Sequence, residues 1–186
     1  PGGNTERFTL KTKQTDGFQL GMVLGDMWWY KNHMGGLDIF KTLYDQDNRW
    51  RLHIRGQHEP GEYNPIMFDH YLESRGIKDV VTLYPPQDDM NEWYENIDIL
   101  LHPGMKETFC YAVGEAASKG IPVVVNEFYG SEGIWPPHWL YETHFDAITR
   151  IQSRDFTDST YIRKYLEDNY GSNHYFKETD EWLGVK

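Results

Sequence analysis

Residues 97–125 read IDILLHPGMKETFCYAVGEAASKGIPVVV, and this stretch decides the fold. The apolar runs at 97–101 and 122–125 have the length of strands, and residues 108–119 between them are predicted to form a helix that ends at Gly120. Strands that are apolar throughout are typical of a parallel sheet covered on both faces, because neither face of such a sheet meets water. The stretch therefore predicts a strand–helix–strand unit of an α/β protein.

The same alternation runs upstream of this unit. Strands are expected at 18–24, 50–54 and 79–84, helices at 37–44, 65–75 and 87–96, and a mainly helical segment from Trp139 onward. Repeated strand–helix pairs predict a doubly wound parallel sheet of the Rossmann-like α/β class. We expect one domain over residues 18–186, preceded by a linker or N-terminal extension over residues 1–17.

Open parallel sheets bind ligands outside the carboxyl ends of their strands. The loops that follow the expected strands are therefore the candidate ligand-binding segments. They comprise residues 25–36, 55–61, 84–89, 102–109 and 126–133.

Composition narrows the class of partner. The 186 residues carry 18 Lys and Arg against 29 Asp and Glu, a formal net charge of −11, which argues against nucleic acid or an anionic membrane as the main partner. No apolar run approaches the roughly 20 residues that a transmembrane helix needs. Cys110 is the only cysteine, so no disulfide framework can form and a reducing, cytoplasmic setting is expected.

Two carboxylates eight residues apart are the candidate functional groups. Glu107 is expected at the amino end of the predicted helix, where it can accept a hydroxyl group while the backbone amides of residues 108–111 face the same pocket. Glu115 follows about two turns later among small apolar residues, and a ribose diol would be a suitable bidentate partner for it. The alternative is that Glu107 only interacts favourably with the helix dipole and that Glu115 is a surface residue.

The flanking sequence favours the functional interpretation. The segment consists of a strand, Pro103, Glu107 and Phe109, followed by Glu-Ala-x-x-x-Gly-x-Pro-Val-Val. This order resembles the E-x7-E signature of the retaining GT-B glycosyltransferases of the glycogen-synthase-like family 4, also described as glycosyl transferases group 1. Leu24-Gly25 with Gly36-Leu37-Asp38 is similar to the first strand and the "KG-x-D" helix start of that family. Further similar segments are the second strand at 52–56, the short helix around 93–94 and the glycine-bearing donor loop at 126–133, so that the resemblance covers about residues 18–133.

The resemblance implies a donor site for a nucleotide-diphosphate sugar of the UDP or GDP type, with no other cofactor and no metal. It implies that Glu107 is the catalytic residue, which holds hydroxyl groups of the donor sugar, and that Glu115 binds the ribose. Lys31 and Arg55 are the candidates for neutralising the diphosphate, with Lys106 as a weaker one that surface charge explains equally well. The loop residues expected to meet the sugar and phosphates are Gly104, Thr108, Phe109, Cys110 and Tyr111.

The resemblance also implies that this chain is one half of an active enzyme. GT-B enzymes use two Rossmann-like domains with the site in the cleft between them, so we expect an N-terminal acceptor domain as a partner. The chain alone should bind a nucleotide sugar and transfer it poorly or not at all. Any peripheral contact with a membrane would come through that other half.

Two departures from the family pattern keep alternatives open. Asp26 stands where the family usually has Arg, and Cys110 stands where it commonly has Gly. Either difference is compatible with an unusual donor or with lost catalysis. The alternatives are a non-catalytic binding module, whose partner surface would include Trp28, Trp29 and Trp135, and a sugar-nucleotide epimerase of GT-B type.

Other cofactor classes lack their signatures. There is no G-x-G-x-x-G fingerprint, no Walker A lysine and no Gly-x-Ser-x-Gly elbow. The histidines considered as metal ligands have no i, i+4 pairing on one helix and no cysteine partner, and we expect structural roles for them. They are His53, His58, His70 and His102, of which His102, at a strand end, could still line the pocket.

Overall fold

The computed structural model describes residues 5–27, 29–57, 65–154 and 158–171. Trp28, His58 and the end of the predicted 55–61 loop lie outside these residues, as do the side chain of Asp26 and the two ends of the chain. In the described part, six strands form one sheet in the order β3-β2-β1-β4-β5-β6, and every neighbouring pair is parallel. This is the doubly wound order, so the predicted fold class is confirmed.

The strands and helices alternate along the chain as the hydrophobic pattern predicts. The strands are β1 Gln19–Asp26, β2 Arg51–Gln57, β3 Val81–Tyr84, β4 Ile99–His102, β5 Val123–Asn126 and β6 Leu140–Tyr141. The α-helices are α1 His33–Gln46, α2 Pro65–Ser74, α3 Asn91–Tyr94, α4 Tyr111–Ser118, α5 His144–Ser153 and α6 Ser159–Tyr170. Short 3-10 turns are η1 Trp29–Lys31, η2 Lys78–Val80, η3 Ser131–Gly133 and η4 Pro137–Trp139. None of the helices in the described residues is long and apolar enough to cross a membrane.

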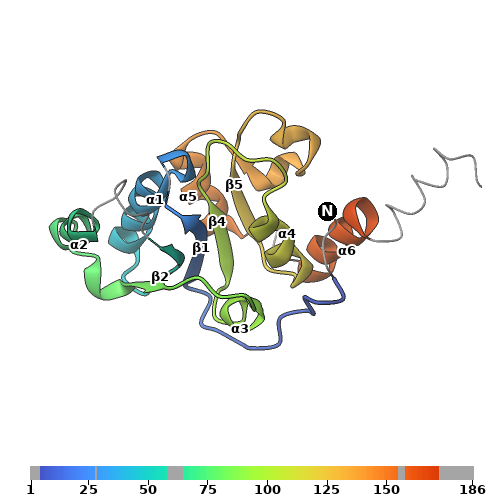
Figure 1. Ribbon diagram of the computed structural model, residues 1–186, viewed down its shortest axis with the longest axis horizontal. Helices are drawn as coiled ribbons and strands as arrows, with labels where there is room; N and C mark the ends of the chain where they lie inside the picture. Colours follow the sequence, from blue (N-terminus) through green and yellow to red (C-terminus); the bar gives the residue numbers. More distant parts are fainter. Residues whose placement is uncertain (1–4, 28, 58–64, 155–157, 172–186) are drawn as a thin grey trace, which may run out of the picture.

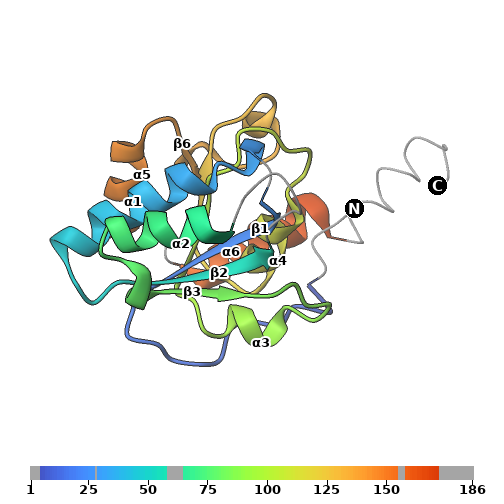
Figure 2. The same ribbon diagram turned by 60° about the vertical axis from the view of Figure 1, so that its left-hand side comes forward.

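Two apolar cores lie on opposite faces of the sheet (Figures 1 and 2). On one face α1, α2 and α5 enclose a core with residues of β1, β2, β4 and β5, and the residues they bury include Leu37, Phe68 and Ile151. On the other face α3, α4 and α6 pack against β4 and β5. Because both faces are covered, β4 is buried along its whole length, and this explains its continuous apolar sequence.

The segment after Trp139 is mainly helical, as predicted, but it also contains an unpredicted sixth strand, β6, which pairs with β5 at Val125 and Asn126. Two predictions about helix bounds are wrong. The helix predicted at 87–96 is limited to α3, Asn91–Tyr94. The helix predicted at 108–119 begins only at Tyr111. The late start has a physical reason: Cys110 has a φ of 57°, and a left-handed residue cannot continue a right-handed helix.

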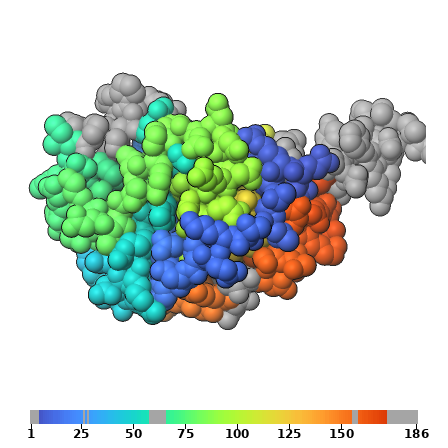
Figure 3. Space-filling view, turned by 90° about the horizontal axis from the view of Figure 1, so that it is seen from below, coloured from blue at the N-terminus to red at the C-terminus, as the bar shows by residue number. Residues whose placement is uncertain are grey.

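Residues 5–17, the described part of the predicted linker, lie along one side of the domain between α3 and α6 (Figure 3). Lys11 donates its backbone N–H to the carbonyl of Lys119, and its Nζ lies 2.7 Å from the carbonyl oxygen of Ile97. Arg163 of α6 donates to the carbonyls of Thr5 and Phe8. The segment is therefore hydrogen-bonded to the rest of the domain at several points along its length.

Glu95 is the central anchor of this segment. Its Oε2 accepts hydrogen bonds from the backbone N–H groups of Thr12 and Lys13, and its Oε1 lies 2.7 Å from Nζ of the buried Lys119. Burial acts to raise the pKa of Glu95, but the Lys119 contact and the two backbone bonds outweigh it and lower the pKa to about 2.

We expect Glu95→Gln to lower stability at neutral pH by about 1–3 kcal/mol, because the buried Lys119 ammonium loses its oppositely charged partner. A carboxyl whose folded pKa lies below its unfolded value, near 4.5, stabilises the fold fully above pH 4.5 and loses that contribution as the pH falls towards 2. Urea denaturation of both proteins should therefore show a difference in free energy of unfolding that shrinks over this window. A difference independent of pH would contradict the assignment.

The candidate donor site

The candidate site lies where the chain leaves the two central strands. β1 and β4 are neighbours in the sheet, but α1, which follows β1, covers one face and α4, which follows β4, covers the other. The loops therefore diverge at the carboxyl ends of these strands, at the switch point where doubly wound proteins bind ligands. The β1–α1 loop contains η1, and the β4–α4 loop spans residues 103–110.

Direct contacts hold these two loops together. The backbone N–H of Met105 donates to the carbonyl of Tyr30 at 2.8 Å, and the Asn32 side chain donates to the carbonyl of Pro103 at 3.1 Å. From the far side, Asn126 at the end of β5 donates its side-chain amide to the carbonyl of Gly104 at 3.3 Å. The loop that carries Glu107 is thus hydrogen-bonded to the loop after β1 on one side and to the end of β5 on the other.

Lys31 and Glu107 form an ion pair across the two loops. Nζ of Lys31 lies 2.5 Å from Oε1 of Glu107, and the side chains are only 22% and 13% exposed. Partial burial strengthens such a pair relative to one in open water. The structure therefore brings together the predicted catalytic carboxylate and the predicted diphosphate-binding cation, although they are 76 residues apart in sequence.

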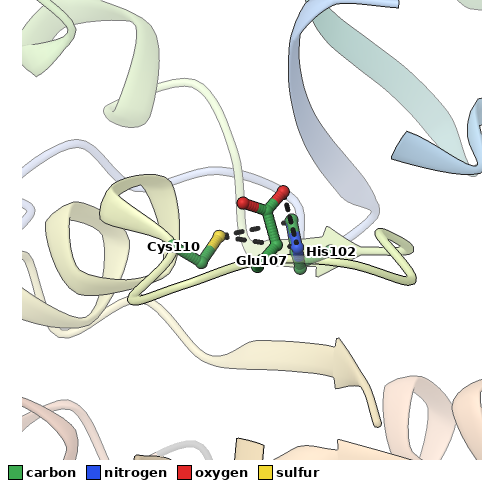
Figure 4. Close-up of side chains that lie close together, drawn as sticks. All are labelled: His102, Glu107 and Cys110. Atoms are coloured by element: carbon green, nitrogen blue, oxygen red, sulfur yellow. Dashed lines mark hydrogen bonds and ion pairs between the residues drawn. The ribbon is translucent and has the colours of Figure 1, made fainter. Parts of the chain in front are cut away.

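His102 and Cys110 complete the cluster around Glu107 (Figure 4). Nε2 of His102 lies 3.6 Å from Oε1 of Glu107, and Sγ of Cys110 lies 3.4 Å and 3.5 Å from the two ring nitrogens of His102. Burial, with a further effect of the Lys31 charge, lowers the pKa of His102 to about 3, so that the ring is neutral at physiological pH. The prediction that the candidate histidines lack a cysteine partner is wrong for His102.

Cys110 is an unreactive thiol in this setting. It is buried, and burial together with the nearby Glu107 charge raises the pKa of the thiol to about 12. The left-handed backbone at this position is the conformation that glycine adopts most easily, and glycine is the residue that the family resemblance predicts here.

Gly104 is required by close packing within the same cluster. A Cβ atom at this position would lie 2.7 Å from Nε2 of His102 and 3.2 Å from Oε1 of Glu107. The first distance is shorter than a side chain tolerates, so any other residue here would displace the imidazole or the carboxylate. Gly104 thus shapes the site by leaving space beside the two side chains.

The position of Glu107 relative to α4 differs from the prediction. Glu107 was expected at the amino end of the helix, but it lies four residues before Tyr111, where α4 begins. The ring of Phe109 packs on Trp135 and Tyr170 at centroid distances of 5.1 and 5.0 Å, so its side chain belongs to the core. Thr108 and Tyr111 are exposed beside the site, as is Lys106.

Glu115 lies on α4 next to the fully buried Tyr94 of α3. The Tyr94 hydroxyl donates to Oε2 of Glu115 at 3.0 Å, and burial raises the pKa of Glu115 despite this hydrogen bond. Sequence reasoning missed Tyr94 as a supporting residue, and its position in the short predicted helix was the only signal. A half-buried carboxylate with one protein donor retains acceptor capacity for a ligand.

Arg55 is hydrogen-bonded to the loop that follows β3. Its guanidinium donates to the carbonyl of Pro85 at 2.5 Å and to Oε1 of Gln87 at 3.2 Å, and it lies 5.8 Å from the Trp93 ring. The candidate role of Arg55 at the diphosphate stays a prediction. Arg55 fixes the loop after β3, on the side of the sheet that carries Tyr94 and Glu115.

A family model described as Glycosyl transferases group 1 matches residues 19–143, well over half of the chain. Among curated proteins, the chain is 36% identical over 95 residues to a D-inositol 3-phosphate glycosyltransferase of Streptomyces bingchenggensis (strain BCW-1). That match covers 47% of this chain and 21% of the relative. The chain spans less than half the length of each of the curated relatives it matches.

Solved structures share the fold at low sequence identity. Anabaena HepE in complex with UDP and glucose superposes with a TM-score of 0.77 at 14% identity, over 100% of this chain and 56% of that one. The C-terminal domain of a glycosyl transferase group 1 family protein from Francisella tularensis gives 0.65 at 15% identity, over 94% and 97% of the two chains. With the family match, these likenesses lead to one conclusion: the chain belongs to the glycosyl transferases group 1 family, and its sheet is that of a GT-B half-domain.

Proposed function

We propose that this chain is the donor-binding half of a retaining glycosyltransferase and that it binds a nucleotide-diphosphate sugar. The observation that carries the proposal is the Lys31–Glu107 pair at the switch point between β1 and β4. A cation and a carboxylate side by side match a donor that carries both phosphate charges and sugar hydroxyl groups. Glu115, on the helix that follows, is then available for the ribose.

Donor binding would redistribute the charges of this pair. The diphosphate is a stronger partner for Lys31 than a single carboxylate, so Lys31 turns to it and Glu107 becomes free to accept hydroxyl groups of the sugar. As the glycosidic bond breaks, negative charge develops on the leaving diphosphate, and Lys31 stabilises that charge. This cation comes from the chain itself, so the proposed transfer requires no metal.

The proposal includes an N-terminal acceptor domain that completes the active site. Its support is the length comparison: the chain covers 56% of Anabaena HepE but 97% of the isolated Francisella C-terminal domain. The side of the sheet where Lys31 and Glu107 lie would face that domain. This chain alone should accordingly bind the donor and transfer it poorly.

Isothermal titration calorimetry with UDP-sugars and GDP-sugars tests the proposal. HepE is a protein of the same fold whose structure contains UDP, so UDP-sugars are the first ligands to try. Saturable binding of either series supports the proposal. The absence of binding by both at millimolar ligand would contradict it.

Glu115→Gln should weaken binding of nucleotide and nucleotide sugar alike by about 10- to 100-fold, because a charged acceptor for the ribose diol is lost. The Tyr94 hydroxyl can still donate to the glutamine carbonyl, so stability should change little. The exposed Glu92→Gln, on α3, is the matched control and should bind as the parent does. Unchanged affinity in Glu115→Gln would favour a non-catalytic binding module instead.

A further inference from the structure

We propose that His102, Glu107 and Cys110 form a binding site for a soft divalent ion such as Zn²⁺, which would displace Lys31 from Glu107. The three residues offer one nitrogen, one oxygen and one sulfur ligand, and these atoms all lie within 4.8 Å of one another. The inference does not depend on the nucleotide-sugar proposal.

The distances from the His102 nitrogens to the other two ligand atoms are close to those of a tetrahedral zinc site, and the third pair, Sγ of Cys110 and a carboxylate oxygen of Glu107, lies within 4.8 Å. Bond lengths of about 2.0–2.3 Å at tetrahedral angles place neighbouring ligand atoms about 3.3–3.6 Å apart. The structure has 3.4 Å and 3.5 Å from the His102 nitrogens to Sγ of Cys110, and 3.6 Å from Nε2 to Oε1 of Glu107. Three protein ligands leave a fourth position for water.

One local adjustment is needed. Sγ of Cys110 is almost equally distant from both ring nitrogens of His102, so it lies over the ring and not along a nitrogen lone pair. A turn of the imidazole about its Cβ–Cγ bond would direct Nε2 at a shared ion. Gly104 leaves space for this turn, because it places no side chain beside Nε2 or beside Oε1 of Glu107.

The chemical types of the three ligands determine which ion the site would bind. Thiolate with imidazole and carboxylate suits Zn²⁺ and Co²⁺, whereas Mg²⁺ and Ca²⁺ prefer oxygen ligands alone. Coordination breaks the S–H bond of Cys110, forms the sulfur–metal bond and transfers one proton to the buffer. Two anionic ligands then neutralise the ion, and Oε1 of Glu107 is no longer available to the Lys31 ammonium.

The first experiment titrates the 186-residue chain with Co²⁺ and then with Zn²⁺. Cys110 is the only cysteine in the sequence, so a cobalt–thiolate charge-transfer band can arise from that residue alone. We expect the band to saturate at one ion per chain, to be abolished by Zn²⁺ and to be unaffected by Mg²⁺. Calorimetry in buffers of different ionisation enthalpy should show release of one proton per Zn²⁺.

Two variants test the ligands. Cys110→Ser should abolish the band, and both Cys110→Ser and His102→Gln should weaken Zn²⁺ binding by more than the roughly 10- to 100-fold that loss of an outer partner of a ligand costs. His138→Gln, outside the cluster, is the control and should retain both readouts; circular dichroism verifies folding. A cobalt complex without the band, or Zn²⁺ affinity retained in Cys110→Ser, would overturn the proposal.

A further consequence rests on the proposed function. Because the ion and a sugar donor would both need Glu107, Zn²⁺ should compete with UDP-sugar binding in the parent chain and not in Cys110→Ser. If the cobalt band forms while no nucleotide sugar binds, the metal site stands and the proposed function fails. If the donor binds and the band is absent, the metal site fails and the proposed function stands.

Discussion

Glu107→Gln is expected to weaken the binding of a UDP-sugar without weakening the binding of UDP alone. The change removes the charged acceptor for the sugar hydroxyl groups, and loss of a hydrogen bond to a charged group costs about 1.5–3 kcal/mol, or roughly 10- to 150-fold in affinity for a UDP-sugar. UDP alone should bind as well as before or up to about tenfold more tightly, because Lys31 loses its protein partner at 2.5 Å and is free for the diphosphate.

Calorimetry with UDP and with a UDP-sugar on the same preparations provides the measurement. Glu142→Gln, an exposed glutamate after β6, is the matched control and should leave both affinities unchanged. An equal loss for both ligands would mean that Glu107 only supports the loop. No loss for either ligand would remove Glu107 from the site.

Trp135→Ala is expected to be the most destabilising of the substitutions considered, at about 3–5 kcal/mol of unfolding free energy. Trp135 is 1% exposed, and its indole packs against Phe109, Trp139 and Tyr170. Its loss would leave a cavity beneath the β4–α4 loop, because Phe109 is the side chain that anchors this loop to the core next to Cys110. Donor affinity should therefore fall even under conditions where the variant remains folded.

Urea denaturation of the parent and of Trp135→Ala measures the first effect, with Trp29→Ala as the control. Trp29 is 68% exposed, so its removal should change the unfolding free energy by no more than about 0.5 kcal/mol. A comparable loss of unfolding free energy in both variants would show that η1, which contains Trp29, contributes to the stability of the fold. A loss below about 1 kcal/mol in Trp135→Ala would contradict the anchoring role.

Most of the sheet could be predicted because its central strands are buried on both faces. Such strands must be apolar along their length, as β4 and β5 are, and that pattern is visible without any structure. β6 is only two residues long, and a strand of that length has no periodicity to detect. Its existence depends on the edge of β5, which is a tertiary contact.

The helix starts were harder to predict for a different reason. Residues 108–110 are compatible with a helix by composition, and the residue that prevents one is Cys110, held in a left-handed conformation. A cysteine gives no sequence signal for that conformation, as glycine or asparagine would. The side chain of Cys110 is buried beside His102, and this contact exists only in the folded structure.

The sequence by itself determined the α/β class, the switch-point loops and the identities of Glu107, Glu115 and Lys31 as candidates, because strand burial and motif spacing are local properties. Only the tertiary structure decided which side chains meet. It paired Lys31 with Glu107, turned Arg55 to the loop after β3 and placed His102 beside Cys110. Contacts across a parallel sheet join residues far apart in the chain, and their geometry is set by strand order and helix packing, which no local pattern encodes.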